Sequence, residues 1–266
     1  PGVPTKIVPN PSDTAVFKFN IAPNEAGSRT GTLTFSSSSG KTSSNVSYSF
    51  TQEGSIVEAT AEMINNAPDG PALFKYSGIV TNIVMDKNDP TKPNKYGNFH
   101  LADATGTVYV YGLLPEEGGA KGQNVITAKG IKIGDIVTVI GPKGSYKGSP
   151  QLVDAWYVSH NNVIVSTVAD FLAAAESKTQ YYRLTGTVSN ITSTTYGNFD
   201  LTDETGTVYF YGLVNFPTYK ADGKFSNNKS FESLDIKDGD KITVCGLRSS
   251  YKGNTQATES YFVMKE

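Results

Sequence analysis

The sequence has few of the residues that build redox, metal or nucleophilic sites. It holds one cysteine and two histidines among 266 residues. A lone cysteine excludes a disulfide within the chain, and Cys245 lies in an apolar stretch, so we expect a small buried core residue there. The HExxH, CxxC, GxSxG and Walker motifs are all missing. We therefore expect no catalytic residues, no metal site and no cofactor.

The sequence also has no excess of positive charge. The formal net charge is −2. Residues 55–160 carry nine basic and ten acidic side chains, and residues 161–266 carry ten and twelve. A protein that binds nucleic acid normally concentrates Lys and Arg on one face, because neutralising phosphates supplies most of the affinity. This balance argues against nucleic acid as the partner.

Long apolar runs are missing too. No stretch of the sequence is long enough to span a bilayer as a helix. The chain begins with Pro1 and Gly2 and has no initiating methionine. We therefore interpret it as a mature or trimmed piece of a longer polypeptide.

What the sequence does have is an internal duplication. Residues 96–113 and 196–213 are near-copies. They differ only at the pairs His100/Asp200, Ala102/Thr202, Ala104/Glu204 and Val110/Phe210. The similarity continues on both sides, where residues 78–83 match 186–191 and residues 145–148 match 250–253. Such self-similarity indicates two copies of one structural unit.

Each copy has the alternation of a β-hairpin. Tyr109 and Tyr111 alternate with valines, a period of two that indicates a strand with one buried face. An Asp-x-Thr-Gly turn, residues 103–106 or 203–206, separates that strand from the preceding one. With the flanking matches, each unit gives a strand, a hairpin pair, a variable connection and two further strands. Five short strands closed on themselves resemble an OB-fold barrel.

A short helix opens each unit. Residues 57–67 suit a helix that ends at Pro68. In the second unit, Ser166 or Thr167 can cap a helix. Its apolar stripe is Val168, Phe171, Leu172 and Ala175. We expect this helix to plug one end of the barrel.

Residues 1–54 form a different module. Apolar alternation at residues 16–21, 29–35 and 46–51 predicts the strands of an all-β, sandwich-like unit. Pro23-Asn24, the Thr30-to-Phe35 strand and the final Thr51-Gln52-Glu53-Gly54 resemble the C-terminal half of a BACON domain. That family is an immunoglobulin-like module of surface and secreted proteins of Bacteroidetes. The resemblance implies either carbohydrate binding or a spacer role, of which the spacer is more typical of the family.

The tandem unit of residues 55–266 is similar to the OB-fold repeats that follow BACON modules in Bacteroidetes lipoproteins. The Tyr-Gly-Asn-Phe hairpins and the Tyr-Lys-Gly turns carry this resemblance. It implies export, either to the cell surface as an outer-membrane lipoprotein or to the periplasm. It also implies that membrane contact is made only through a lipid anchor outside this chain. It carries over no catalytic residue.

The predicted fold class is therefore all-β with one short helix per barrel. A partial immunoglobulin-like β-sandwich module, residues 1–54, precedes two tandem five-stranded OB-fold barrels, residues 55–160 and 161–266. The sequence leaves the oligomeric state open.

The predicted binding surface is the outer face of the hairpin strands, which OB barrels use for ligands. Alternation points these residues inward: Phe99, Leu101, Val108, Val110, Phe199, Leu201, Val208 and Phe210. It points these outward: Asn98, His100, Tyr109 and Tyr111 in the first unit, and Asn198, Asp200, Tyr209 and Tyr211 in the second. The turn residues that border this surface are Tyr146, Lys147, Tyr251 and Lys252, with Gln151 and Gln256 nearby.

Three functions fit such a surface. Two exposed tyrosines on one strand can stack on the C–H face of a sugar, which favours a non-catalytic module that binds a glycan or glycoprotein. The same rings can stack on bases, so single-stranded nucleic acid is the alternative, with steep salt dependence as its signature. A pure spacer is the third, and it predicts that both tyrosine pairs are buried at interfaces. Because His100 is replaced by Asp200 in the copy, a duplicated active site cannot depend on it.

Two loops differ between the units. Asp86, Asn88 and Asp89 offer oxygen atoms of the kind that calcium prefers, but the spacing lacks the glycine and distal glutamate of an EF-hand, so we expect a plain polar loop. The longer connection in the second unit, residues 215–233, contains Phe216, Tyr219, Phe225 and Phe231. These aromatic residues either fasten the loop to the barrel, which we favour, or form a contact surface.

Overall fold

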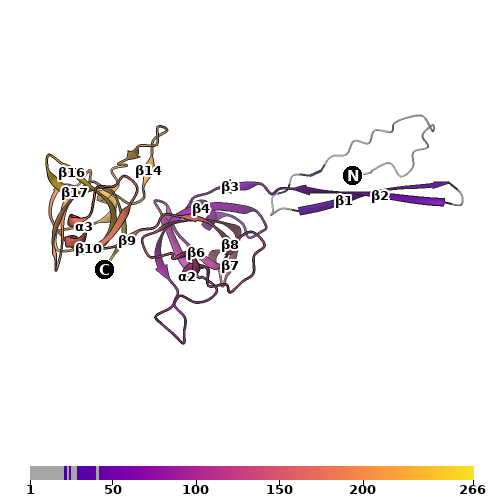
Figure 1. Cartoon of the computed structure of the whole chain (residues 1–266), viewed down its shortest axis with the longest axis horizontal. Coiled ribbons are helices and arrows are strands. Elements are labelled where there is room, and N and C mark those ends of the chain that lie inside the picture. Colours follow the sequence, from indigo (N-terminus) through magenta and orange to yellow (C-terminus); the bar gives the residue numbers. More distant parts are fainter. Residues whose placement is uncertain (1–20, 23, 25–28, 40–41) are drawn as a thin grey trace. The chain divides into compact units, whose positions relative to one another are not determined.

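The computed structural model of the chain describes residues 21–22, 24, 29–39 and 42–266. The chain divides into two compact units, 1–55 and 56–266. β-Strands dominate the described residues and the α-helices are short (Figure 1), so the fold class is all-β, as predicted. No helix of these residues is long and apolar enough to cross a membrane.

The described part of the N-terminal unit is a two-stranded antiparallel sheet. Strand β1 (Arg29–Ser39) pairs with β2 (Thr42–Gln52) along their whole lengths. Phe35 and Tyr48 meet edge to face on it, with ring centroids 6.2 Å apart. The strands predicted at 29–35 and 46–51 are thus present and longer than predicted, whereas residues 16–20 of the other predicted strand, and Pro23, lie outside the described residues.

The first barrel is a closed ring of five strands. Its elements are β3 (Ile56–Glu58), α1 (Ala61–Asn66), β4 (Leu73–Ile83), β5 (Phe99–Asp103), β6 (Gly106–Leu114), α2 (Val125–Lys129), β7 (Ile136–Tyr146) and β8 (Ser149–His160). The ring runs β4-β5-β6-β8-β7 and closes because β7 pairs with β4. Within it only β6 and β8 run parallel. This is an OB-fold barrel.

The second barrel repeats this ring. Its elements are β9 (Ile164–Val165), α3 (Val168–Ala173), β10 (Tyr181–Ser193), β11 (Asn198–Asp203), β12 (Gly206–Tyr211), β13 (Leu213–Val214), β14 (Thr218–Tyr219), β15 (Phe225–Ser226), the 3-10 helix η1 (Phe231–Leu234), β16 (Lys241–Tyr251) and β17 (Asn254–Lys265). The ring runs β10-β11-β12-β17-β16 and closes between β16 and β10. The two tandem OB-fold barrels predicted from the duplication are therefore present.

The duplicated turn anchors the helix that plugs each barrel. Asp103 accepts hydrogen bonds from the Thr105 amide at 2.7 Å and, through its other oxygen, from the Ala61 amide at 2.9 Å. Asp203 repeats both bonds, the second to the Val168 amide at 2.8 Å. An acceptor at the first turn satisfies amides that have no partner inside the helix. The turn and the helix are thus one structural unit.

The helices are shorter than predicted. Val57 and Glu58 lie in β3, because their backbone pairs in parallel with β4. Thr167 is the N-cap of α3, as predicted, but Ala175 is exposed and lies beyond the helix end at Ala173. The first barrel also carries α2 in its variable connection, where the sequence analysis predicted one helix per barrel.

The barrel interiors match the predicted alternation. All eight residues predicted to point inward are at most 2% exposed. Phe199 and Phe210 stack with ring centroids 5.0 Å apart. Phe231, from the long connection, stacks on Phe199 at 5.9 Å and completes the second core. Cys245 is buried, as predicted, and burial raises the pKa of its thiol to about 12.

The two barrels meet through hydrogen bonds and an apolar cluster. The turn that precedes β7 presents two carbonyl groups to the second barrel: Arg183 donates to Ile133 O at 2.6 Å and Tyr261 donates to Gly134 O at 2.8 Å. An apolar cluster surrounds these bonds, to which Ile79 contributes from the first barrel. Hydrogen bonds from Arg and Tyr side chains to backbone carbonyls therefore link the two barrels, beside packed apolar groups.

Candidate ligand-binding faces

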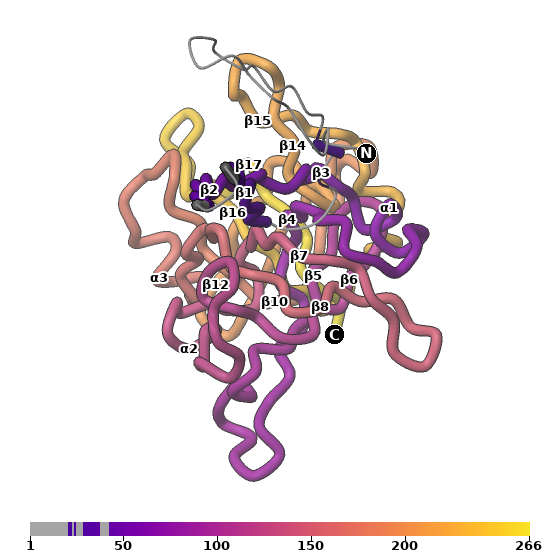
Figure 2. The backbone as a smooth tube through the Cα atoms, turned by 90° about the vertical axis from the view of Figure 1, so that its right-hand side faces the viewer, coloured from indigo at the N-terminus to yellow at the C-terminus, as the bar shows by residue number. Residues whose placement is uncertain are grey.

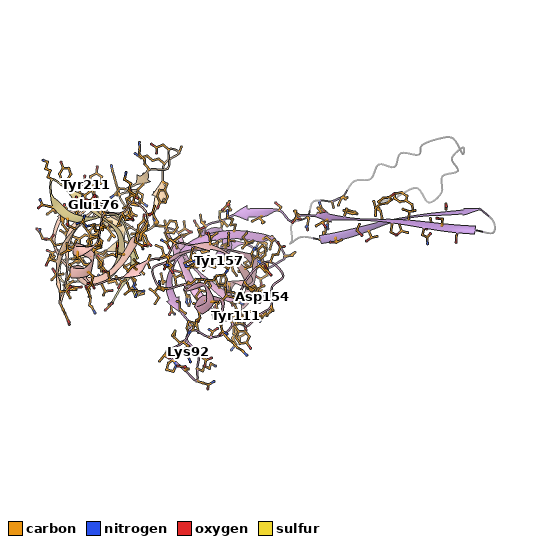
Figure 3. The ribbon with its side chains drawn as sticks, in the orientation of Figure 1. Lys92, Tyr111, Asp154, Tyr157, Glu176 and Tyr211 are labelled. Atoms are coloured by element: carbon orange, nitrogen blue, oxygen red, sulfur yellow. The ribbon has the colours of Figure 1, made fainter. Side chains whose placement is uncertain are left out.

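The outer face of the first barrel carries a row of three rings. His100 lies opposite Tyr109 in the β5–β6 pairing, and their ring centroids are 4.9 Å apart. Tyr109 and Tyr111 follow at 6.5 Å. Tyr111 is 49% exposed, whereas Tyr109 and His100 are half-buried. The predicted site residues of the first hairpin are thus brought together, and Figure 3 labels Tyr111 beside Asp154.

This row is electrically neutral. Burial lowers the pKa of His100, so the imidazole is uncharged at neutral pH. Burial also raises the pKa of Tyr109. Among the described residues, the buried Nδ1 of His100 has no hydrogen-bond partner. The row therefore offers ring faces and polar tips without a net charge, which suits contact with a neutral, amphipathic ligand.

Polar residues frame the row on one side. Asn98 Oδ1 accepts a hydrogen bond from the Gly112 backbone amide at 2.9 Å, so one hydrogen-bonding group of the Asn98 side chain is already used within the barrel. Asp154 forms an ion pair with Lys121, at 2.7 Å. Gly112 has a φ of +87°, and a Cβ there would lie 3.0 Å from the Asp154 carboxylate. The glycine therefore lets this ion pair sit close to the strand that carries Tyr111.

The second face has the same tyrosines but a different charge. Tyr209 lies opposite Asp200 and beside Gln256, and Tyr211 is 59% exposed. Asp200 accepts a hydrogen bond from Asn190 at 2.9 Å. Asn198 Oδ1 is buried and has no partner in the described part of the chain. A carboxylate thus replaces the imidazole of the first face.

The hairpin tips extend both faces. In the β7–β8 register, Tyr146 lies two positions beyond Gly144, which pairs with Gln151 beside Tyr109. Alternation therefore keeps Tyr146 on the outer side of the sheet. Tyr146 and its counterpart Tyr251 are 64% and 62% exposed.

Both tips have the same turn. Lys147 and Lys252 each have a φ of 50° and are followed by a glycine with positive φ, as in the tight turns that suit hairpins. The Lys147 ammonium lies 5.4 Å from the Tyr146 ring centroid, and the Lys252 ammonium lies 5.3 Å from that of Tyr251. The four predicted border residues therefore form two matching Tyr-Lys pairs.

An ion cluster fixes each hairpin. Lys143 is 8% exposed and binds Asp69 at 2.5 Å, and Ser145 donates to the same carboxylate. The hydrogen bond from Lys143 holds the pKa of Asp69 below its usual value. Arg248 binds Glu176 at 3.2 Å in the equivalent place. These contacts position the tips relative to the barrels.

One exposed tyrosine beside each tyrosine strand was not predicted from the sequence. Tyr96 and Tyr196 are 49% and 46% exposed. Their carbonyls accept from Leu113 at 2.8 Å and from Leu213 at 3.0 Å, which ties them to the far end of the tyrosine strand. A lysine lies over each ring, Lys95 at 5.1 Å and Lys229 at 5.5 Å. Both tyrosines open the copied stretch, but they precede the strand, so alternation could not place them.

The loop of residues 84–95 in the first barrel is held by hydrogen bonds of its own side chains. Asp86 accepts hydrogen bonds from the Asn88 and Asp89 amides, and Asp89 pairs with Lys92. No group of three or more His, Cys, Asp or Glu side chains that could hold a metal occurs among the described residues.

In the long connection of the second barrel, Phe216 and Phe225 pack on the apolar cluster between the barrels and Phe231 enters the core, so these three fasten the loop. Tyr219 is 54% exposed.

Comparison with known proteins adds no assignment: no protein-family model matches the chain, and a search of curated proteins found no match.

Proposed function

We propose that this protein is a non-catalytic extracellular module that binds a glycan or glycoprotein through two corresponding faces, one on each barrel. One observation carries the proposal. Three exposed tyrosines recur at matching positions in both barrels: Tyr96, Tyr111 and Tyr146 in the first, and Tyr196, Tyr211 and Tyr251 in the second. The rings can stack on the C–H faces of sugars while their hydroxyls bond to sugar hydroxyls, and this side of an OB barrel is a known oligosaccharide-binding surface.

Cys245 and His100, the residues best suited to act as a nucleophile or a base, support binding over catalysis. Cys245, with its buried thiol and a pKa of about 12, is not poised as a nucleophile. His100 stacks on Tyr109 in one face and is replaced by Asp200 in the other. A mechanism that depends on either residue would run in one barrel only, whereas the tyrosines are shared.

Charge supports a glycan over single-stranded nucleic acid. Asp200 lies on the second face, directly opposite Tyr209. On the first face, Lys121 forms an ion pair with Asp154. Phosphate binding requires free cations along the groove, so these carboxylates work against it. The exposure of Tyr111 and Tyr211 likewise works against the spacer alternative, which requires these side chains to be covered.

The cellular setting of the proposal follows the sequence resemblance. A partial BACON-like module followed by tandem OB-fold repeats suits a surface or secreted lipoprotein of Bacteroidetes, exported to the cell surface or the periplasm. In that setting, two faces on one chain would raise avidity for a ligand with repeated epitopes, because the second contact is intramolecular.

A printed array of mucin-type and plant glycans, with single-stranded oligonucleotides beside them, tests the proposal. We expect saturable glycan binding that is unchanged between low and physiological salt. Tyr109→Ala/Tyr111→Ala and Tyr209→Ala/Tyr211→Ala should each weaken it, and Tyr219→Ala, an exposed tyrosine outside both faces, should not. Binding to oligonucleotides alone, with a steep loss on adding salt, would overturn the proposal in favour of nucleic acid.

A further inference from the structure

The two faces differ most in the connection before Tyr96 or Tyr196. In the first barrel, twelve residues, 84–95, join Ile83 to Tyr96, whereas in the second four residues, 192–195, join Ile191 to Tyr196. We call residues 84–95 the finger. It projects from the first barrel between β4 and β5 (Figure 2), and Figure 3 shows its Lys92 on the same side of the barrel as Tyr111.

Backbone hydrogen bonds give the finger a defined shape. The Asp86 amide donates to Lys92 O at 2.8 Å, and the Asn94 amide donates to Val84 O at 2.9 Å. The Asn94 side chain closes the base, where its oxygen accepts from the Gly97 amide at 3.0 Å. A connection paired along its length in this way can hold a binding surface in place.

A depression of about 280 Å³ lies at the base of the finger. Its apolar walls include Met85 and Tyr96, which are 38% and 49% exposed. Asp86 and Asn88 add a carboxylate and an amide, and Lys87 and Lys95 also line it. Apolar walls with a few polar groups are typical of small-molecule sites, and this combination matches a sugar ring, which has C–H faces and a hydroxyl rim.

Asn98 joins the depression to the row of rings. It lines the depression, and its oxygen accepts a hydrogen bond from the amide of Gly112, the residue next to Tyr111. A glycan stacked on Tyr109 and Tyr111 would therefore reach the depression without leaving the protein surface.

We propose that the depression is an additional subsite that binds one further sugar ring of the glycan held on the first face. This inference rests on the proposed function and extends it. The first barrel would then recognise a longer or branched glycan, and the second barrel, which has no finger, a shorter one. The two faces would be related but not interchangeable.

The test compares short and long glycans on the first face alone. Tyr209→Ala/Tyr211→Ala silences the second face in every variant. The probes are released mucin oligosaccharides and xyloglucan fragments, each in a fraction of two or three sugars and a fraction of six or more. The variants are Met85→Ser, Asn88→Ala and a finger shortened to the sequence of residues 192–195. Met63→Ser is the matched control, since this methionine is also exposed but lies on α1, outside the finger.

We expect each finger variant to weaken binding of the long fraction by about tenfold and to leave the short fraction unchanged. Thermal melting confirms that each variant is folded, and the two point variants serve if the shortened finger does not fold. The subsite would be overturned if the parent chain bound both glycan fractions with equal affinity, or if the finger variants lost the same affinity for both. Either result would leave the proposed function intact. If the parent chain binds neither probe at any length, the proposed function itself fails, and the subsite with it.

Discussion

The two barrels share one pattern of residues, yet the same surface has opposite character in each. In the first barrel, Ile79, Ile133 and Ile136 pack in the apolar cluster between the barrels. Residues 131–139 align with residues 236–244 as part of the duplication. The counterparts in the second barrel are therefore Thr187, Asp238 and Lys241, and all three are exposed. The copies therefore diverged where their surroundings differ: one surface became an interface and the other a polar end, as in the terminal repeat of an array.

The tyrosines show the reverse behaviour. Tyr111 and Tyr211 stayed the same although both are largely exposed and contribute little to either core. Packing explains why Phe199 or Leu201 is retained, but it does not explain an exposed ring. An exposed residue kept in both copies is better explained by a shared ligand, and this contrast between surfaces is what the following predictions test.

The largest expected effect is at the interface. Tyr261→Ala removes a ring with no exposed surface and its bond to Gly134 O, so the free energy of unfolding should fall by about 3–5 kcal/mol. Urea denaturation followed by circular dichroism measures this. Tyr261→Phe, which loses only the hydroxyl, should cost about 1–2 kcal/mol. If Tyr261→Ala costs less than the phenylalanine variant, the ring is not part of the stabilising contact.

Exchanging the surfaces is the next test. Ile133→Asp places the residue of the second barrel into the interface and should cost about 2–3 kcal/mol, because a carboxylate would be desolvated there. Asp238→Ile makes the opposite exchange at an exposed position, and it should change stability by less than about 0.5 kcal/mol. Equal effects of the two exchanges on the urea midpoint would show that the surfaces do not differ as described.

The turn aspartates should behave alike in both barrels. Asp203→Ala and Asp103→Ala each remove an acceptor at a helix start and should cost about 1–2 kcal/mol at pH 7. Burial raises the pKa of Asp203, but hydrogen bonds from Thr205, Val168 and Gly206 outweigh it and hold that pKa below its usual 3.8. The stabilisation is therefore present above pH 3.8 and is lost as the pH falls through the lower folded-state pKa.

Urea titrations at pH 7 and at low pH check this dependence for Asp203. The gap in stability between Asp203→Ala and the parent should narrow on acidification. A gap that stays constant down to the acid transition would mean that the carboxylate charge has no part in holding the turn to the helix.

The smallest effect on stability should come from the faces. Tyr111→Ala and Tyr211→Ala remove largely exposed rings, and each should change the free energy of unfolding by less than about 0.5 kcal/mol. The same variants should weaken glycan binding about tenfold or more. A large loss of stability with unchanged binding would reverse the roles that we assign to these residues.

Much of the fold could be predicted because the chain repeats itself. The alternation around Tyr109 and Tyr209 gave the inward and outward residues correctly, and the Asp-x-Thr-Gly turn marked the hairpin. Val57 and Glu58 were assigned to a helix, because residue preferences alone do not reveal that β4 offers a free edge for pairing.

The site was less predictable. Strand alternation gave Tyr111 and Tyr211, but Tyr96 precedes its strand, and its backbone is held by a tertiary hydrogen bond from Leu113. The contacts of Ile133 with Arg183 and of Gly134 with Tyr261 join residues far apart in sequence, and no local sequence pattern predicts them. Comparing the copies residue by residue, and asking where an isoleucine faces a charged counterpart, is the sequence signal that could have found them.

Isothermal titration of the chain with the glycan that binds best on the array tests the central claim most directly. Two faces predict two equivalents of a short glycan per chain, with an affinity unchanged by salt, and one equivalent after Tyr109→Ala/Tyr111→Ala. The account would be contradicted if the parent chain bound only one equivalent and the Tyr109→Ala/Tyr111→Ala chain bound the same amount. It would also be contradicted if the parent chain bound no glycan at all.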